Sequence, residues 1–110
     1  MLTNNMRPIH PGEILREEFL APTEMSVSAL AMALRVPAPR INDIVREKRA
    51  ITPDTALRLA RYYSTTPEFW LNLQIAYELR LARKKSFTDI ERDVCPRSGT
   101  ESATTPQPVS

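Results

Sequence analysis

Glycine and cysteine are scarce in this sequence. It contains two glycines and one cysteine among 110 residues. The single cysteine, Cys95, cannot form a disulfide within one chain, which excludes a small fold held together by disulfides. Few glycines and no long runs of β-branched residues favour an all-α fold over a β-sheet.

Long apolar runs are missing as well. No stretch reaches the roughly 20 apolar residues that a membrane-spanning helix needs, and the N-terminus lacks the apolar centre of a secretion signal. We therefore predict a cytoplasmic protein with no membrane contact.

The sequence also lacks clusters of catalytic or metal-binding residues. Its one histidine, His10, stands far from Cys95, so no zinc-binding spacing exists. It has neither a glycine-rich phosphate loop nor a nucleophile motif. We predict that the protein is not an enzyme and takes no metal or cofactor. His10 precedes a proline at a predicted helix start and is interpreted as a cap.

Prolines, by contrast, are common, and several stand where helices begin. The sequence has ten prolines, and proline suits the first helical turn because an N–H there has no intrahelical partner. The start signals are His10-Pro11-Gly12-Glu13, Ser26, Thr52-Pro53-Asp54 and Thr66-Pro67-Glu68. With apolar residues at helical spacing, they predict helices near residues 11–21, 27–35, 38–46, from 53 onward, and 67–85, with Pro22 ending the first.

Residues 26–44 are typical of two short helices joined by a tight turn. Apolar residues fall where the two helices press against each other: Leu30, Ala31, Leu34, Val36, Ile41 and Ile44. Polar residues of the second helix lie on its opposite side. This is the pattern of a helix-turn-helix, whose second helix can enter the major groove of DNA. An ordinary helical hairpin in a small bundle is the alternative.

Basic residues gather around this second helix, although the formal net charge is only +2. The cluster consists of Arg35, Arg40, Arg46, Lys48 and Arg49. It suits a polyanion, because each phosphate contact releases counterions. A solvated helix face would carry similar charges, so this alternative stays open.

Nine residues are candidates for contacts with double-stranded DNA. They are Ser28, Ala38, Pro39, Arg40, Asn42, Asp43, Arg46, Lys48 and Arg49. Arg40 can offer a bidentate fork to guanine or to a phosphate, and Asn42 can bond to adenine. Asp43 can accept from cytosine or orient Arg40. The two apolar residues at the helix tip can touch a thymine methyl, and the serine and the later basic residues are placed for phosphates.

The last predicted helix is apolar around most of its circumference. A helix of this kind must bury more than one face. One face closes the domain's own core, and the other needs a second surface, most simply another copy of the chain. A two-fold dimer suits a DNA reader, since paired motifs read half-sites about 34 Å apart. A wholly intramolecular core is the alternative, and Trp70 belongs to either core or interface.

Composition divides the chain into three parts. We expect a flexible leader over residues 1–9, a helix-turn-helix domain with a C-terminal dimerisation helix over residues 10–85, and a mostly disordered polar tail over residues 86–110. Within that tail, Phe87, Ile90 and Val94 could form one short amphipathic helix.

Five segments together carry a family resemblance: HPGEILREEFL, SALAMAL, RINDIV, KRAITPDTALRLARYY and TPEFWLNLQIAYELR. Over about residues 8–85 the chain resembles the HigA group of antitoxins, which are Xre-type, lambda-repressor-like helix-turn-helix proteins. The resemblance implies a five-helix dimer that neutralises a RelE-like ribonuclease toxin and represses its own operon at a palindromic operator. It implies DNA-reading positions at Ala38, Pro39, Arg40 and Asp43. It implies core and dimer positions at Phe69, Trp70, Leu73 and Tyr77.

Two places depart from the family pattern. Arg35 stands at the turn where glycine is usual, and glycine is the residue that best tolerates a positive φ. Pro37, Ala38 and Pro39 stand in place of a serine cap and a polar pair. The second departure concerns the base contacts, while the apolar frame of the motif is complete.

The functional prediction is therefore an antitoxin that binds both DNA and a toxin. A stand-alone Xre-type transcriptional regulator without a toxin partner is the alternative. A protein-interaction module that has lost DNA binding is a third possibility.

Overall fold

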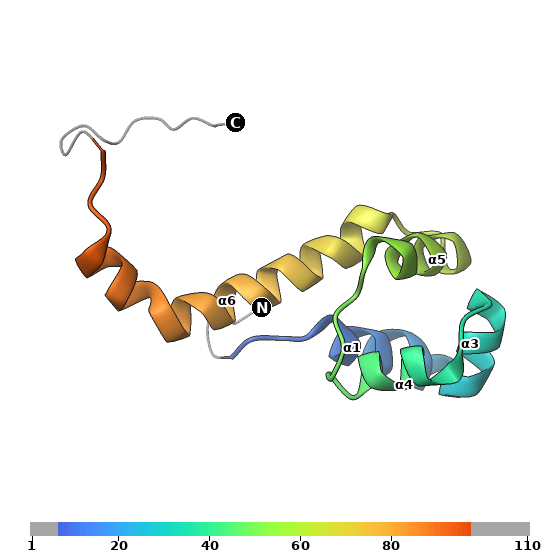
Figure 1. Cartoon of the computed structure of the whole chain (residues 1–110). Helices are drawn as coiled ribbons and strands as arrows, with labels where there is room; N and C mark the ends of the chain where they lie inside the picture. The colour runs from blue at the N-terminus through green and yellow to red at the C-terminus, as the bar shows by residue number, and fades with distance from the viewer. Residues whose placement is uncertain (1–6, 98–110) are drawn as a thin grey trace. The chain divides into compact units, whose positions relative to one another are not determined.

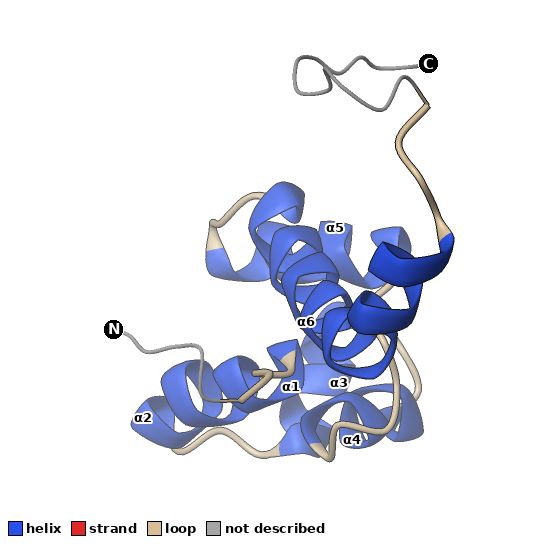
Figure 2. Ribbon diagram, turned by 90° about the vertical axis from the view of Figure 1, so that its left-hand side faces the viewer, coloured by secondary structure: helices blue, strands red, loops and turns tan. Residues whose placement is uncertain are grey.

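The structure, a computed structural model, describes residues 7–97, and all regular elements in that range are helices (Figures 1 and 2). Along the chain these are α1 (Pro11–Ile14), η1 (Leu15–Leu20), α2 (Ala21–Thr23), α3 (Val27–Leu34), α4 (Ala38–Val45), α5 (Pro53–Tyr63) and α6 (Pro67–Asp93). The first three are consecutive parts of one helix whose middle is π-helical. The predicted all-α fold of five helices is thus confirmed.

The predicted helix starts are capped as expected. At α1, His10 Nδ1 accepts a hydrogen bond from the backbone N–H of Gly12 at 2.8 Å. The hydroxyl oxygens of Ser26, Thr52 and Thr66 accept in the same way at the starts of α3, α5 and α6. These bonds satisfy N–H groups that the first turn of a helix leaves without a partner.

The first helix runs past Pro22, where the sequence predicted its end. It stops at Glu24, which takes a left-handed conformation with φ of 55°. The Thr23 hydroxyl donates to the carbonyl oxygens of Phe19 at 2.8 Å and Leu20 at 3.2 Å. These bonds tie the Thr23 side chain back to the last turn of the helix.

The last helix, α6, also runs further than predicted, to Asp93 rather than to about Lys85. Neither glycine nor proline occurs between Pro67 and Pro96 to end it. Residues 86–93, predicted as part of the polar tail, are therefore helical. Residues 1–6 of the predicted leader and residues 98–110 of the predicted tail lie outside the described range.

The chain forms two units, Met1–Arg80 and Leu81–Ser110, and one apolar core fills the first. Its buried members are Leu15, Leu20, Leu30, Ala31, Leu34, Ile41, Ile44, Val45, Ile51, Ala56, Leu59, Ala60 and Trp70. Five of the six residues predicted to join the helices of the helix-turn-helix are among them, and Val36 packs against them half-buried. The predicted packing of this motif is confirmed.

The first turn of α1 packs directly on the backbone of α4. A Cβ added to Gly12 would lie 1.8 Å from the carbonyl oxygen of Ile44 and 2.8 Å from its carbonyl carbon. Both distances are far inside van der Waals contact. Only glycine therefore fits at position 12, and this contact fixes the start of the first helix against the second helix of the motif.

Among residues 7–97, no helix combines the length and the apolar character needed to cross a membrane.

Candidate nucleic-acid interface

The turn between α3 and α4 is held by backbone bonds around a left-handed residue. Arg35 has φ of 62° and ψ of 45°. The N–H groups of Arg35 and Val36 donate to the carbonyl oxygens of Met32 at 3.1 Å and Ala31 at 3.0 Å. Arg35 thus adopts, with a full side chain, the conformation that glycine tolerates best.

The two faces of α4 differ sharply. Ile41, Ile44 and Val45 are buried in the core. The opposite side and the loop that follows are exposed or half-exposed. Besides the acidic Glu47, they carry the eight residues predicted there to contact DNA: Ala38, Pro39, Arg40, Asn42, Asp43, Arg46, Lys48 and Arg49. We call this set the α4 edge. Ser28, on α3, is exposed as well.

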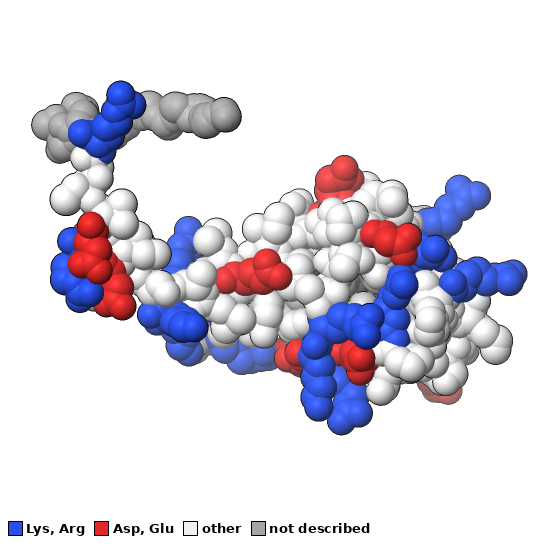
Figure 3. All heavy atoms as spheres, in the orientation of Figure 1, with Lys and Arg blue, Asp and Glu red and all other residues white. Residues whose placement is uncertain are grey.

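The α4 edge lies in a strongly basic part of the first unit. Figure 3 shows Lys and Arg side chains gathered over the end that carries α3, α4 and α5. Beyond the α4 edge, these helices contribute Arg58 and Arg61 from α5. Such a surface attracts a polyanion.

Arg40 is held by a carboxylate from the next helix. Its Nη1 donates to Asp54 Oδ2 at 2.8 Å, and Arg58 Nε donates to the same oxygen at 2.9 Å. Asp54 stands in the first turn of α5, after the cap residue Thr52. The two arginines hold the pKa of the Asp54 carboxyl below its usual value, Arg58 more than Arg40. Asp54 is therefore ionised at neutral pH.

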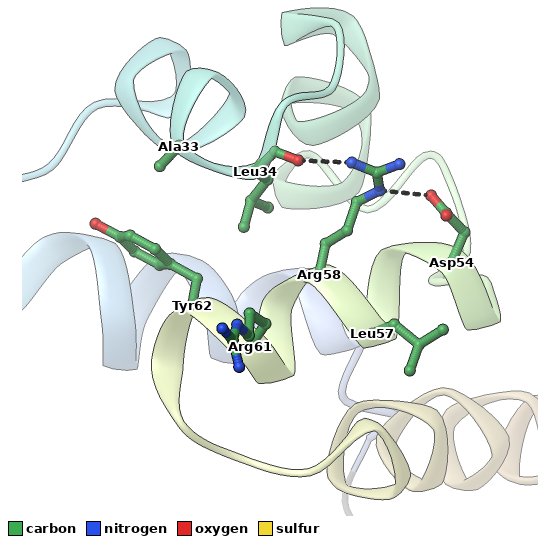
Figure 4. Close-up of a pocket in the computed structure, with 7 residues that line it drawn as sticks. All are labelled: Ala33, Leu34, Asp54, Leu57, Arg58, Arg61 and Tyr62. Atoms are coloured by element: carbon green, nitrogen blue, oxygen red, sulfur yellow. Dashed lines mark hydrogen bonds and ion pairs between the residues drawn. The ribbon is translucent and has the colours of Figure 1, made fainter.

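Arg58 also ties this cluster to the turn of the motif. Its Nη1 donates to the carbonyl oxygen of Leu34 at 2.9 Å (Figure 4). Leu34 is the last residue of α3, and its carbonyl has no partner within the helix. One side chain on α5 therefore contacts both the end of α3 and, through Asp54, the arginine of α4.

A second ion pair lies on the α4 edge itself. Arg49 Nη2 and Asp43 Oδ2 are 3.3 Å apart. A hollow opens between the two pairs and is lined by Arg40, Arg49, Ala50, Thr52, Asp54 and Thr55. The prediction that Asp43 could orient Arg40 is not what the structure shows, since Asp43 pairs with Arg49 and Asp54 pairs with Arg40.

The C-terminal end of α4 is anchored from the first helix. Arg16 Nη1 donates to the carbonyl oxygen of Val45, and Arg16 Nη2 lies 3.4 Å from Glu47 Oε2. A cation at a helix C-terminus is favourable because that end carries partial negative charge. The first helix thus fixes both the position and the end of α4.

Comparison with known proteins places this geometry in a family. A helix-turn-helix family model matches residues 17–70. The virulence-associated protein I of Dichelobacter nodosus is 58% identical over 81 residues, covering 74% of this chain and 75% of that protein. A solved structure of the Pseudomonas aeruginosa antitoxin HigA with the higBA promoter has a TM-score of 0.80 and 53% identity, covering 83% of this chain and 99% of that one.

A second solved structure agrees. It is an addiction module antidote protein of the HigA family from Coxiella burnetii, with a TM-score of 0.80 and 55% identity over 83% of this chain and 99% of that one. The chain belongs to the HigA family of antitoxins. HigA proteins of this kind are Xre-type helix-turn-helix proteins, so the resemblance read from the sequence is confirmed.

The residues that the HigA resemblance assigned to a dimer surface differ in how deeply they are buried. Trp70 is fully buried, and its Nε1 donates to Thr65 Oγ1 at 2.8 Å. It has no exposed surface for a second copy, so its place in the dimer interface is corrected to the core. Leu73 is half-buried against the core, whereas Phe69 is 39% exposed.

Tyr77 is half-buried because its ring packs on His10, with centroids 4.8 Å apart. On another side of α6, Ile75 is 58% exposed and Leu79 is 46% exposed. Within the first unit, α6 thus offers apolar surface at Phe69, Ile75 and Leu79.

The sequence prediction missed three residues that hold the α4 edge in place. Asp54 was interpreted only as an acid at a helix start, and Arg16 and Arg58 had no predicted role. The spacing of Asp54 and Arg58 by four residues is a signal for their ion pair. No local pattern predicts that α4 and α5 bring Arg40 to the same carboxylate.

Proposed function

We propose that this protein is the antitoxin of a type II toxin–antitoxin module, a binding protein and not an enzyme. As a dimer, it binds a palindromic operator in its own promoter through the α4 edge and represses its operon. It also binds and neutralises a RelE-like mRNA-cleaving toxin encoded beside it.

The observation that carries this proposal is the exposed basic α4 edge on a helix whose other face is locked in the core. A rigid helix with an exposed basic side meets the geometric need of major-groove binding. The likeness to HigA solved with the higBA promoter supports the same function for this chain. The exposed apolar residues of α6 support a dimer.

Operator binding is tested first with Arg40→Ala. The probe is a duplex of the promoter directly upstream of this chain's gene, in an electrophoretic shift assay. We expect affinity to fall by about 10- to 100-fold, because a bidentate arginine contact contributes about 1–3 kcal/mol of base discrimination. The matched control is Arg83→Ala, which removes the same charge from an exposed position on α6, outside the basic surface of α3, α4 and α5. Undiminished binding by Arg40→Ala, or an equal loss in Arg83→Ala, contradicts the assignment of Arg40.

The toxin and the dimer need separate measurements. Co-expression with the adjacent small gene product should rescue growth and yield a stable complex on co-purification. A protein that binds its promoter but neither rescues nor co-purifies is a stand-alone regulator. Sedimentation at micromolar concentration should show a dimer, and a monomer would contradict that part of the proposal.

A further inference from the structure

One carboxylate oxygen in this protein serves two arginines on different helices. Asp54 Oδ2 accepts from Arg58 Nε at 2.9 Å and from Arg40 Nη1 at 2.8 Å. The Arg58 contact joins residues four apart on α5 and is an ordinary helix-surface pair. The Arg40 contact is different, because it crosses from α5 to the α4 edge and holds the arginine that the proposed function assigns to DNA.

Asp54 has a structural role that the Arg58 contact alone would satisfy. It lies in the first turn of α5, where a negative charge is favourable. Arg58 in turn keeps its own bond to the carbonyl of Leu34. Neither the position of Asp54 at the start of α5 nor its pair with Arg58 requires Arg40. The contact between Arg40 and Asp54 therefore needs its own explanation.

We propose that Asp54 is a positioning residue that sets how selectively Arg40 reads DNA. In the absence of DNA, the carboxylate holds the guanidinium through one nitrogen. A single non-cognate phosphate offers Arg40 little more than Asp54 already does. A guanine edge, with acceptors at O6 and N7, accepts two hydrogen bonds from the guanidinium, so Arg40 exchanges Asp54 for the base. This inference rests on the proposed function of operator binding.

The strength of the pair suits this competition. The Arg40 side chain is 31% exposed and that of Asp54 is 55% exposed. Ion pairs with this exposure contribute little to stability, so the contact exchanges readily when a better partner arrives. The Asp54 charge lies beside a hollow that Arg40 and Arg49 also line, and it repels the backbone phosphates of every duplex alike. The preference for the promoter therefore comes from the guanine contact of Arg40 and not from this repulsion.

The test compares two duplexes of equal length: the protein's own promoter and the same bases in shuffled order. The measured quantity is the ratio of the two dissociation constants. Asp54→Asn keeps the shape and removes the charge. We expect it to bind the shuffled duplex more tightly and to lower the ratio by about two- to fivefold, the range that an ion pair of this exposure can supply. Asp54→Glu restores the charge and should recover most of the ratio.

Controls separate this role from net charge and from folding. Glu18→Gln removes an equal charge from an exposed position on the first helix and should leave the ratio unchanged. On an Arg40→Ala background, Asp54→Asn should no longer alter the ratio, because the residue acts through Arg40. On an Arg58→Ala background it should still do so. Thermal melts confirm that each variant is folded.

The outcomes distinguish the two proposals. A wild-type protein that binds both duplexes equally overturns operator recognition and, with it, the role of Asp54. A wild-type protein that prefers its promoter, with the same ratio in Asp54→Asn, overturns only the role of Asp54. A change in ratio that persists without Arg40 also overturns it.

Discussion

Two places in the first unit put unusual demands on the backbone, and the chain meets them in opposite ways. At the first turn of α1, Gly12 lies against the backbone of Ile44, where a Cβ would come within 1.8 Å of the carbonyl oxygen. At the turn after α3, Arg35 takes φ of 62°, a conformation that favours glycine. The chain keeps glycine at the first place and not at the second.

The difference shows which demand is the harder one. A left-handed conformation costs an ordinary residue about 1–2 kcal/mol, whereas a collision with backbone can be relieved only by moving a helix. Within residues 7–97, four non-glycine residues adopt the left-handed conformation: Glu24, Arg35, Glu47 and Ser64. At Arg35 the side chain adds a positive charge next to the α4 edge, which a glycine cannot do.

The largest effect is expected from Gly12→Ala. The added methyl must push α1 from α4, so we expect the free energy of unfolding to fall by about 3 kcal/mol or more, the upper range for overpacking. Urea denaturation measures it. Ala29→Val, which enlarges an exposed residue on α3, is the control and should cost under about 1 kcal/mol. Equal losses in the two variants would show that the contact with Ile44 is not decisive.

Gly12 also illustrates how far the sequence could predict this fold. The local sequence around it correctly predicted a helix start, because it contains a cap residue, a proline and an acid: His10, Pro11 and Glu13. The need for glycine at position 12 arises from contact with Ile44, 32 residues later in the chain, and no local pattern contains it. The end of α6 was not predicted for a different reason: the helix continues to Asp93 through residues that neither favour nor forbid it.

In the candidate site, too, some features could be predicted from the sequence and others could not. The exposed side of α4 followed from the spacing of its apolar residues, Ile41 and Ile44, which fixes the opposite face. The partner of Arg40 did not, because Asp54 is 14 residues away and meets it only through the packing of α5 on the motif. Trp70 could not be assigned to core or interface from its neighbours, because the choice depends on how α6 crosses the earlier helices.

A smaller effect is expected from pH, again at the first turn of α1. His10 Nδ1 accepts the N–H of Gly12, so the cap requires the neutral imidazole. Burial lowers the pKa of His10 below 6.5, with Arg16 acting in the same direction and Glu47 opposing. Between the folded and unfolded pKa values the unfolded chain binds more protons, so the free energy of unfolding is highest above pH 6.5 and falls as the pH drops below it.

Loss of the cap should cost about 1 kcal/mol. Urea denaturation at pH 7.5 and at pH 5.5, values chosen about one unit on either side of the reference pKa of His, measures the decrease. In His10→Asn an acceptor that does not titrate replaces the imidazole, so the decrease between these pH values should shrink. The same decrease in both proteins would assign it to other groups.

The smallest effect is expected from placing glycine at a left-handed position that carries another residue. Ser64→Gly, in the turn between α5 and α6, relieves a left-handed residue with φ of 57°. The relief of about 1 kcal/mol is partly offset by the greater freedom of glycine in the unfolded chain, about 0.5 kcal/mol. A gain of about 0.5 kcal/mol in the free energy of unfolding is therefore expected from urea denaturation.

Arg35→Gly is the matched variant at the turn of the motif. It should gain about the same stability, since φ at the two positions is 62° and 57°. Only Arg35→Gly should weaken binding to the promoter duplex and reduce its salt dependence, because it alone removes a charge beside the α4 edge. If both variants bind DNA like the wild type, the arginine at this turn is not retained for its charge, and the contrast with Gly12 reduces to the difference in steric cost.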